Sequence, residues 1–132
     1  MGMKSPPDLA AKCLAMADPV AAPKLPDDIS EKDFQARVIA LAKERHWLCY
    51  HTYSSKRSEP GFPDLVLARI DSLAKIGQPE NGRVIFAELK RSDGDLNKEQ
   101  VIWGSLLLQI KGTVEYYLWK PEDWERIKEI LK

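Results

Sequence analysis

The sequence lacks an overall charge. Its 132 residues include 20 lysines and arginines against 20 aspartates and glutamates, which gives a formal net charge of zero. A protein that coats nucleic acid without selectivity carries a large basic excess, so that class is disfavoured. A local basic groove on an otherwise balanced surface remains compatible with this composition.

The sequence also has few cysteines and no long apolar run. Its two cysteines, Cys13 and Cys49, stand far apart and without a C-x-x-C pair, which argues against a zinc site and indicates a reducing compartment. No apolar stretch approaches the roughly 20 residues of a membrane-spanning helix. The first residues lack the apolar centre of a secretory signal. We therefore expect a soluble, cytoplasmic protein.

The rest of the composition is that of a globular protein, with 44% hydrophobic and 30% charged residues. The length suits one domain with its own core. Prolines gather in residues 1–29, which predicts a partly flexible arm with one short helix near residues 8–17. The folded domain is expected over residues 30–132.

Hydrophobic periodicity predicts an α/β domain with the order α-β-β-β-α-β-α. We expect a mixed four-stranded sheet with helices on both faces, because the second and third strands are almost continuously apolar. The predicted helices span residues 30–46, 96–112 and 121–132, and the predicted strands span residues 47–53, 64–70, 83–90 and 113–119.

Local signals support these boundaries. Ser30 has the side chain of a helix N-cap, and Asp33 places negative charge in the first turn. Gly112 is expected to end the second helix, and Pro121 suits the first position of the last one.

The stretch "VIFAELK", residues 84–90, combines an apolar strand with an acid and a base at its end. Glu88 and Lys90 are two residues apart, so on a strand they point to the same face. Asp64 begins the preceding predicted strand. If the two strands are antiparallel and in the right register, all three side chains meet at one end of the sheet.

Two adjacent carboxylates repel each other, and a divalent cation removes that penalty. Asp64 and Glu88 oxygens suit Mg²⁺ or Mn²⁺, and the backbone carbonyl of Leu89 could supply a further ligand. Lys90 could then act on the attacking water or neutralise charge on a phosphate. A lone Glu-x-Lys is usually a solvated strand end, but here an apolar strand and a preceding Pro-Asp accompany it.

At these positions the chain resembles the VRR-NUC family of the PD-(D/E)XK nuclease superfamily, in particular its small stand-alone phage and bacterial members. The resemblance covers about residues 30–120. It rests on Gly61-Phe62-Pro63-Asp64, Ala87-Glu88-Leu89-Lys90, Gln100, Trp103 and Gly112.

The resemblance implies a restriction-endonuclease-like core with metal ligands at Asp64 and Glu88 and a catalytic Lys90. It places Gln100 near the active centre, where it would order water or phosphate, and gives Trp103 a packing role. The family also has an acidic residue on its first helix. Glu31 or Gln35 could be its equivalent; we favour Glu31, because an amide is a poorer ligand for a hard cation.

The loop after the first predicted strand is polar and basic. Tyr53 could stack on a base, and Ser54, Lys56 and Arg57 could contact phosphates, as could Arg91 after the third strand. A solvated loop would have the same composition.

These features together predict a Mg²⁺- or Mn²⁺-dependent DNA endonuclease. The resemblance implies a structure-selective enzyme for Holliday junctions or flaps, and cutting two symmetric strands would require a homodimer. The alternative is a non-catalytic nucleic-acid-binding or assembly module on a nuclease fold. A restriction-type enzyme with base-specific readout ranks lower, because the chain has little room for a recognition domain.

Overall fold

A computed structural model describes residues 25, 26, 28–70 and 81–132. The short helix predicted near residues 8–17 and most of the connection at residues 71–80 lie outside the described residues. Leu25 and Ile29, at the end of the predicted N-terminal arm, pack against the core of the domain.

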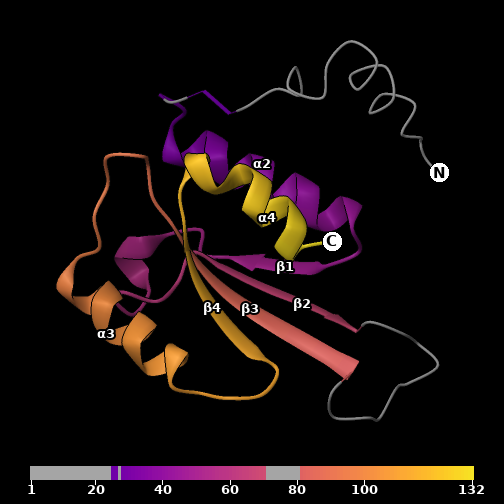
Figure 1. The fold of residues 1–132 in the computed structure, drawn as a ribbon. Helices are drawn as coiled ribbons and strands as arrows, with labels where there is room; N and C mark the ends of the chain where they lie inside the picture. The colour runs from indigo at the N-terminus through magenta and orange to yellow at the C-terminus, as the bar shows by residue number, and fades with distance from the viewer. Residues whose placement is uncertain (1–24, 27, 71–80) are drawn as a thin grey trace.

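The described chain contains three α-helices, four strands and two short 3-10 turns, in the predicted order (Figure 1). The helices are α2 (Glu31–Glu44), α3 (Lys98–Leu108) and α4 (Trp124–Ile130), and the strands are β1 (Leu48–His51), β2 (Leu65–Ile70), β3 (Gly82–Leu89) and β4 (Val114–Trp119). The 3-10 turns are η2 (Ser55–Arg57) and η5 (Pro121–Asp123).

The four strands form one mixed sheet in the order β1-β2-β3-β4. β1 and β2 are antiparallel, as are β2 and β3, whereas β3 and β4 are parallel and joined through α3. The predicted α/β class and mixed four-stranded sheet are therefore confirmed.

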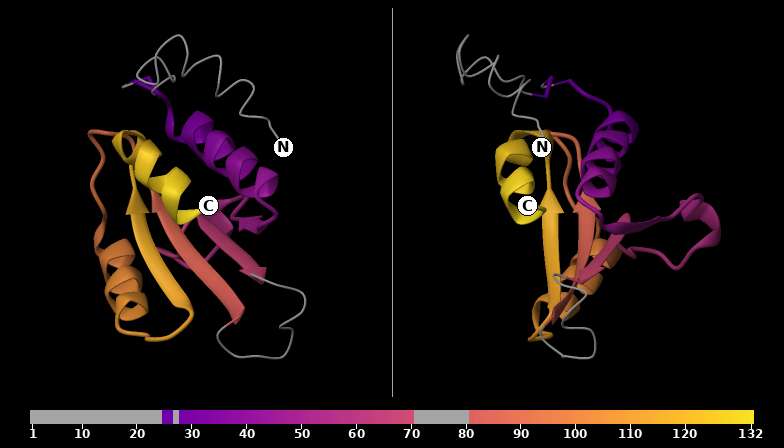
Figure 2. Two further views of the ribbon diagram at one scale, coloured as in Figure 1. Left: turned by 45° about the vertical axis from the view of Figure 1, so that its right-hand side comes forward. Right: turned by 90° about the vertical axis from the view of Figure 1, so that its right-hand side faces the viewer.

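One face of the sheet forms the core beneath α2 and α4, which lie side by side (Figures 1 and 2). Alternate residues of the central strands point to this face, among them Leu65, Leu67, Ile85 and Ala87, and all four are fully buried. Phe34 of α2 and other apolar residues of α2 and α4 cover them. As predicted, Ser30 caps α2: its hydroxyl accepts the backbone N–H of Asp33 at 3.0 Å.

The other face of the sheet carries α3, which lies beside β4 and apart from the two other helices (Figures 1 and 2). Gly104 allows the close contact. A Cβ at this position would lie 2.8 Å from the hydroxyl oxygen of Tyr116. Phe62 is packed edge-on between Phe86 of β3 and Trp103 of α3, with ring centroids 6.0 and 5.0 Å away. Trp103 thus has the predicted packing role.

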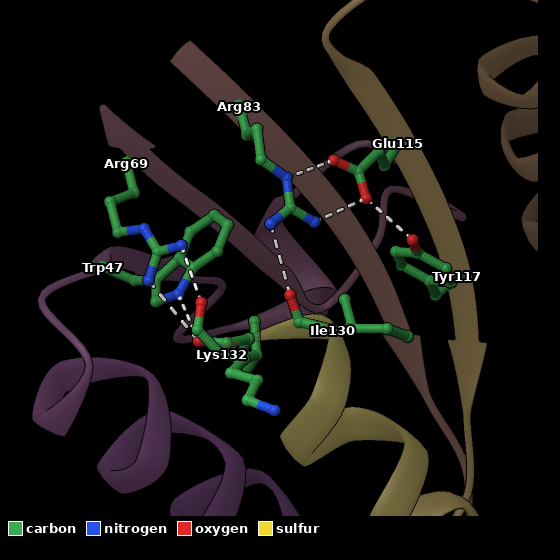
Figure 3. A network of polar contacts seen from close by, with 8 residues as sticks. Trp47, Arg69, Arg83, Glu115, Tyr117, Ile130 and Lys132 are labelled. Carbon is green, nitrogen blue, oxygen red and sulfur yellow. Dashed lines mark hydrogen bonds and ion pairs between the residues drawn. The ribbon is translucent and has the colours of Figure 1, made fainter. Parts of the chain in front are cut away.

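Polar contacts join the end of α4 to the sheet (Figure 3). Arg83 of β3 forms a two-pronged ion pair with Glu115 of β4, at 2.7 and 2.9 Å, and donates to the carbonyl of Ile130 at 3.3 Å. The hydrogen bond from Arg83 lowers the pKa of the Glu115 carboxyl. Trp47 lies beneath both Arg69 and Arg83 and donates to the carbonyl of Leu131 at 3.1 Å.

Three predicted boundaries were wrong by a few residues. α3 ends at Leu108 rather than near Gly112, because the chain turns at Gln109 and Ile110, whose N–H groups bond three residues back. Gly112 has a φ of +102° and lies in the turn before β4 instead. Pro121 begins a 3-10 turn, with α4 following from Trp124, and β1 is shorter than predicted. In the described part of the chain, no helix is long and apolar enough to cross a membrane.

Candidate active site

The register of the two central strands brings Asp64 and Glu88 together. Leu65 pairs with Ala87 and Val66 pairs with Phe86, so the next residue outward, Asp64, lies opposite Glu88. Both side chains point to the face that carries α3. The Asp64 carboxylate also accepts the backbone N–H of Leu89 at 2.8 Å. This bond continues the contact between the two strands beyond their last backbone pair, Leu65 and Ala87. The antiparallel pairing and register that the site requires are thus present.

The Glu88 carboxyl is buried, with 2% of the residue exposed. Burial, together with the hydrogen bond to Asp64 and the charge of Asp64, raises the pKa of Glu88 to about 9. At neutral pH and without a cation, the Glu88 carboxyl therefore retains its proton. Burying a carboxyl group beside a second acid costs stability, and such groups are more frequent at functional sites than in structural cores.

Gly61 shapes the loop that leads into Asp64. Its φ of +86° is strained for residues with a side chain. A Cβ on Gly61 would also lie 2.4 Å from the backbone carbon of Glu99, in the first turn of α3. The Gly-Phe-Pro-Asp stretch thus brings the start of β2 against the N-terminus of α3, and glycine is needed for both reasons.

Gln100 connects α3 to the carboxyl pair. Its Nε2 donates to the Glu88 carboxyl at 3.0 Å, while its Oε1 accepts the backbone N–H of Asn97 at 2.9 Å. Asn97 in turn caps α3, because its side chain accepts the backbone N–H of Gln100 at 2.9 Å. The sequence predicted that Gln100 would lie near the active centre and order water or phosphate. In the structure, its side chain contacts Glu88 instead.

Asn97 was not among the predicted site residues. The available signal was the spacing Asn-x-x-Gln at the start of a helix, which is a variant of the capping box. Such a pattern indicates a helix start, and only the fold shows that the Gln of the box reaches a buried acid.

A polar cavity of about 530 Å³ opens beside the carboxyl pair. Asp64 and Gln100 line it from the sheet and α3, and Glu31 and Gln35 line it from α2. Burial and then the charge of Asp64 raise the pKa of Glu31. The charge of Glu31 also contributes to the raised pKa of Glu88.

Lys90 completes the group. Its backbone N–H donates to the carbonyl of Trp119 at 3.0 Å, which holds the chain in line beyond β3. The positive charge of Lys90 lowers the pKa of both Glu88 and Glu31, opposing the effect of burial. Lys90 therefore acts on both carboxyl groups through its charge.

The donors available here suit a hard divalent cation. In the described part of the chain, no three Asp, Glu, His or Cys side chains are close enough to hold one ion together. Glu31 thus does not form a three-residue set with Asp64 and Glu88 in this arrangement. Magnesium is nevertheless commonly held by one or two carboxylates with water completing the octahedron. Asp64 and Glu88, opposite each other at the end of the sheet, are two such carboxylates.

The predicted DNA-contacting residues lie at and beyond the rim of the cavity. Tyr53 lines it, is 89% exposed, and has its ring centroid 4.2 Å from that of His51. Ser54, Lys56 and Arg57 are exposed around the η2 turn but do not line the cavity. Arg91 is exposed as well and pairs with Asp93 at 3.6 Å.

A larger hollow of about 690 Å³ lies at the opposite end of β2 and β3, between Arg45, Ile70 and Gly82. Among the described residues, its lining contains three arginines and one histidine but no carboxylate. The paired acids lie at the other end of the sheet, so we place the candidate active site there.

Comparison with known proteins adds no family to this description. Neither the family models, nor the curated proteins, nor the solved structures contain a significant match to the chain.

Proposed function

We propose that the protein is a Mg²⁺- or Mn²⁺-dependent DNA endonuclease with a restriction-endonuclease-like fold. The observation that carries the proposal is the placement of Asp64, which lines an open polar cavity, directly opposite the buried Glu88. The charge of Lys90 also acts on Glu88. Strongly shifted carboxyl pKa values are more frequent at functional sites than in structural cores, and a bound cation would stabilise both acids in their ionised form.

The reaction is hydrolysis of a phosphodiester: water adds to phosphorus, one P–O ester bond breaks, and a proton passes to the leaving oxygen. A bound divalent cation would supply Lewis acidity and charge neutralisation at the phosphate. Asp64 and Glu88 would hold it, and the Leu89 carbonyl would add a ligand. Lys90 would orient the attacking water and offset negative charge that develops on the phosphate oxygens.

The proposed substrate is branched DNA, such as a Holliday junction or a flap. Tyr53 offers an exposed ring at the cavity rim for stacking on an unpaired base, and Lys56 and Arg57 offer charge to the backbone. We further propose a twofold homodimer, because symmetric cutting of two strands requires two active sites.

A cleavage panel tests the proposal. Junction, flap, single-stranded, duplex and RNA substrates are incubated with Mg²⁺, Mn²⁺ or chelator. We expect metal-dependent cutting of branched DNA, and a loss of at least about a hundredfold in Asp64→Ala and Lys90→Ala. Lys111→Ala, an exposed lysine at the far end of β4, is the matched control and should retain activity.

Two results would count against the enzyme. Cutting that survives both Asp64→Ala and Lys90→Ala would remove the proposed site. Metal-independent binding of branched DNA, with no cutting under any condition, would instead support the non-catalytic binding module.

A further inference from the structure

We propose that Asn97 is a positioning residue for Glu88, acting through Gln100, so that the N-cap of α3 is part of the metal site. This inference rests on the proposed function. The inference goes beyond the proposed function because it assigns a role to Asn97, which lies three residues before Gln100 in the sequence and does not itself contact Glu88.

The contacts form an unbroken chain from the helix end to the acid. The backbone N–H of Asn97 donates to Gln100 Oε1 at 2.9 Å, and Gln100 Nε2 donates to Glu88 at 3.0 Å. The Asn97 side chain accepts the backbone N–H of Gln100 at 2.9 Å. Both ends of the Gln100 amide are therefore engaged within the protein.

Residue 97 contributes to the orientation of the Gln100 side chain. A glutamine side chain has three rotatable bonds, and fixing them costs conformational entropy. The backbone N–H of residue 97 holds Oε1, so the Nε2 donor is already directed at Glu88 before any ligand arrives. The Asn97 side chain accepts the Gln100 N–H and so fixes the first turn of α3, in which these bonds are made. Such partners of metal-binding carboxylates hold the carboxylate in the geometry that the ion requires.

The first turn of α3 is itself fixed against β2. The close approach of Gly61 to the Glu99 backbone places the helix start next to the loop that carries Asp64. Asn97 and Gln100 therefore link the position of Glu88 to that of the loop that carries Asp64. An ordinary capping box stabilises only its helix; this one also reaches across to the sheet.

The experiment compares Asn97→Ala with Asn97→Asp, which keeps an acceptor for the Gln100 N–H. Mn²⁺ affinity is measured by calorimetry on the full chain, and kcat and KM on the best substrate of the cleavage panel. We expect Asn97→Ala to weaken Mn²⁺ binding about threefold to tenfold and Gln100→Ala about tenfold or more. Asn97→Asp should stay within about twofold of the unaltered chain.

A double substitution separates positioning from general loss of stability. Adding Asn97→Ala to Gln100→Ala should weaken Mn²⁺ binding no further, because the contact through which Asn97 acts is already gone. Asp123→Ala removes a comparable bond, from the Lys120 N–H at 2.9 Å, at the start of the last helical segment. That control should lower the thermal midpoint and leave Mn²⁺ affinity unchanged.

Side-chain amide NMR of the metal-free chain keeps this test independent of catalysis. The Gln100 Nε2 resonances should shift in Asn97→Ala and not in Asp123→Ala. Unchanged resonances, unchanged Mn²⁺ affinity in Asn97→Ala, or additive losses in the double variant would each overturn the inference. If even the unaltered chain neither binds Mn²⁺ nor cuts DNA, the proposed function fails, while the NMR result still decides whether Asn97 orients Gln100.

Discussion

At the scale of single residues, Glu88 is a buried acid that faces a second acid, Asp64. Burial, and then the hydrogen bond to Asp64, raises the pKa of Glu88 to about 9, and the positive charge of Lys90 opposes this shift. Gln100 donates to the Glu88 carboxyl. Burying such a group costs stability, and strongly shifted carboxyl pKa values are more frequent at functional sites than in structural cores.

The raised pKa predicts how stability depends on pH in the absence of metal. In the unfolded chain the pKa of Glu88 returns to its ordinary value of 4.5, whereas the native state retains the proton up to about pH 9. The native state thus binds more protons between these values, and the contribution of Glu88 to stability falls as pH rises through this window. Glu88→Gln removes the effect, so its advantage over the unaltered chain should grow from pH 5 to pH 8.5.

Urea unfolding with chelator present measures this difference. Glu129→Gln, a change at an exposed carboxylate, should follow the pH profile of the unaltered chain. If the stability of Glu88→Gln and that of the unaltered chain changed with pH in parallel, the raised pKa of Glu88 would be contradicted.

At the scale of elements, the position of α3 depends on a contact between one glycine and one tyrosine. Gly104 is buried within the helix, and Tyr116 of β4 fills the space where its side chain would be. The Tyr116 hydroxyl is buried and has no hydrogen-bond partner in the described structure. Its close approach, rather than any polar bond, sets how near α3 lies to the sheet, and so where Gln100 can reach.

Gly104→Ala should therefore destabilise the protein, by about 1–3 kcal/mol, although alanine favours helices by about 1 kcal/mol over glycine. Tyr116→Phe removes one of the two nearest atoms and should cost little alone, because the hydroxyl has no partner. In the double variant, the cost of Gly104→Ala should be smaller than in the single one.

The free energy of unfolding in urea checks the cycle, with Ser105→Ala as an exposed control on the same helix. A stabilising effect of Gly104→Ala, or strict additivity with Tyr116→Phe, would show that the helix and the strand are not in the contact described.

At the scale of the whole molecule, the sheet separates a closed side from an open one. α2 and α4 cover the core face, and the polar network in Figure 3 joins the end of α4 to the sheet. Among the helices in the described part of the chain, only α3 lies on the other face. Residues 100–110 contain no charged side chain. Ile102 and Leu106, on the side away from the sheet, are 57% and 56% exposed. A helix that is apolar all round normally has a partner on each side.

The proposed homodimer would use this surface. Leu106→Glu should shift the protein from dimer to monomer in sedimentation experiments, because a charge in an apolar interface loses its hydration without gaining a partner. Leu48→Glu is the matched control: Leu48 is 77% exposed on β1, and the same substitution there should leave the dimer intact.

Circular dichroism of Leu106→Glu and Leu48→Glu would check that both variants fold. A monomeric unaltered chain, or a dimer that tolerates Leu106→Glu, would contradict the use of this surface.

Much of the fold follows from local signals in the sequence. Phe34 and Val38 recur at helical spacing, and Ser30 precedes them as a cap, so the local sequence predicts α2 without information from the rest of the chain. Strand periodicity alone puts Glu88 and Lys90 on one face. The end of α3 was less predictable, because apolar residues continue past Leu108 and only the turn to β4 stops the helix.

The sequence by itself determined the order of the elements and the types of side chain at the ends of β2 and β3. Tertiary structure alone decided that Asp64 lies opposite Glu88, that Gln100 donates to Glu88, and that Gly61 contacts the start of α3. The physical reason is range. Helix and strand periodicity depends on residues a few positions apart, whereas strand register and helix placement depend on packing between segments that are distant in the chain.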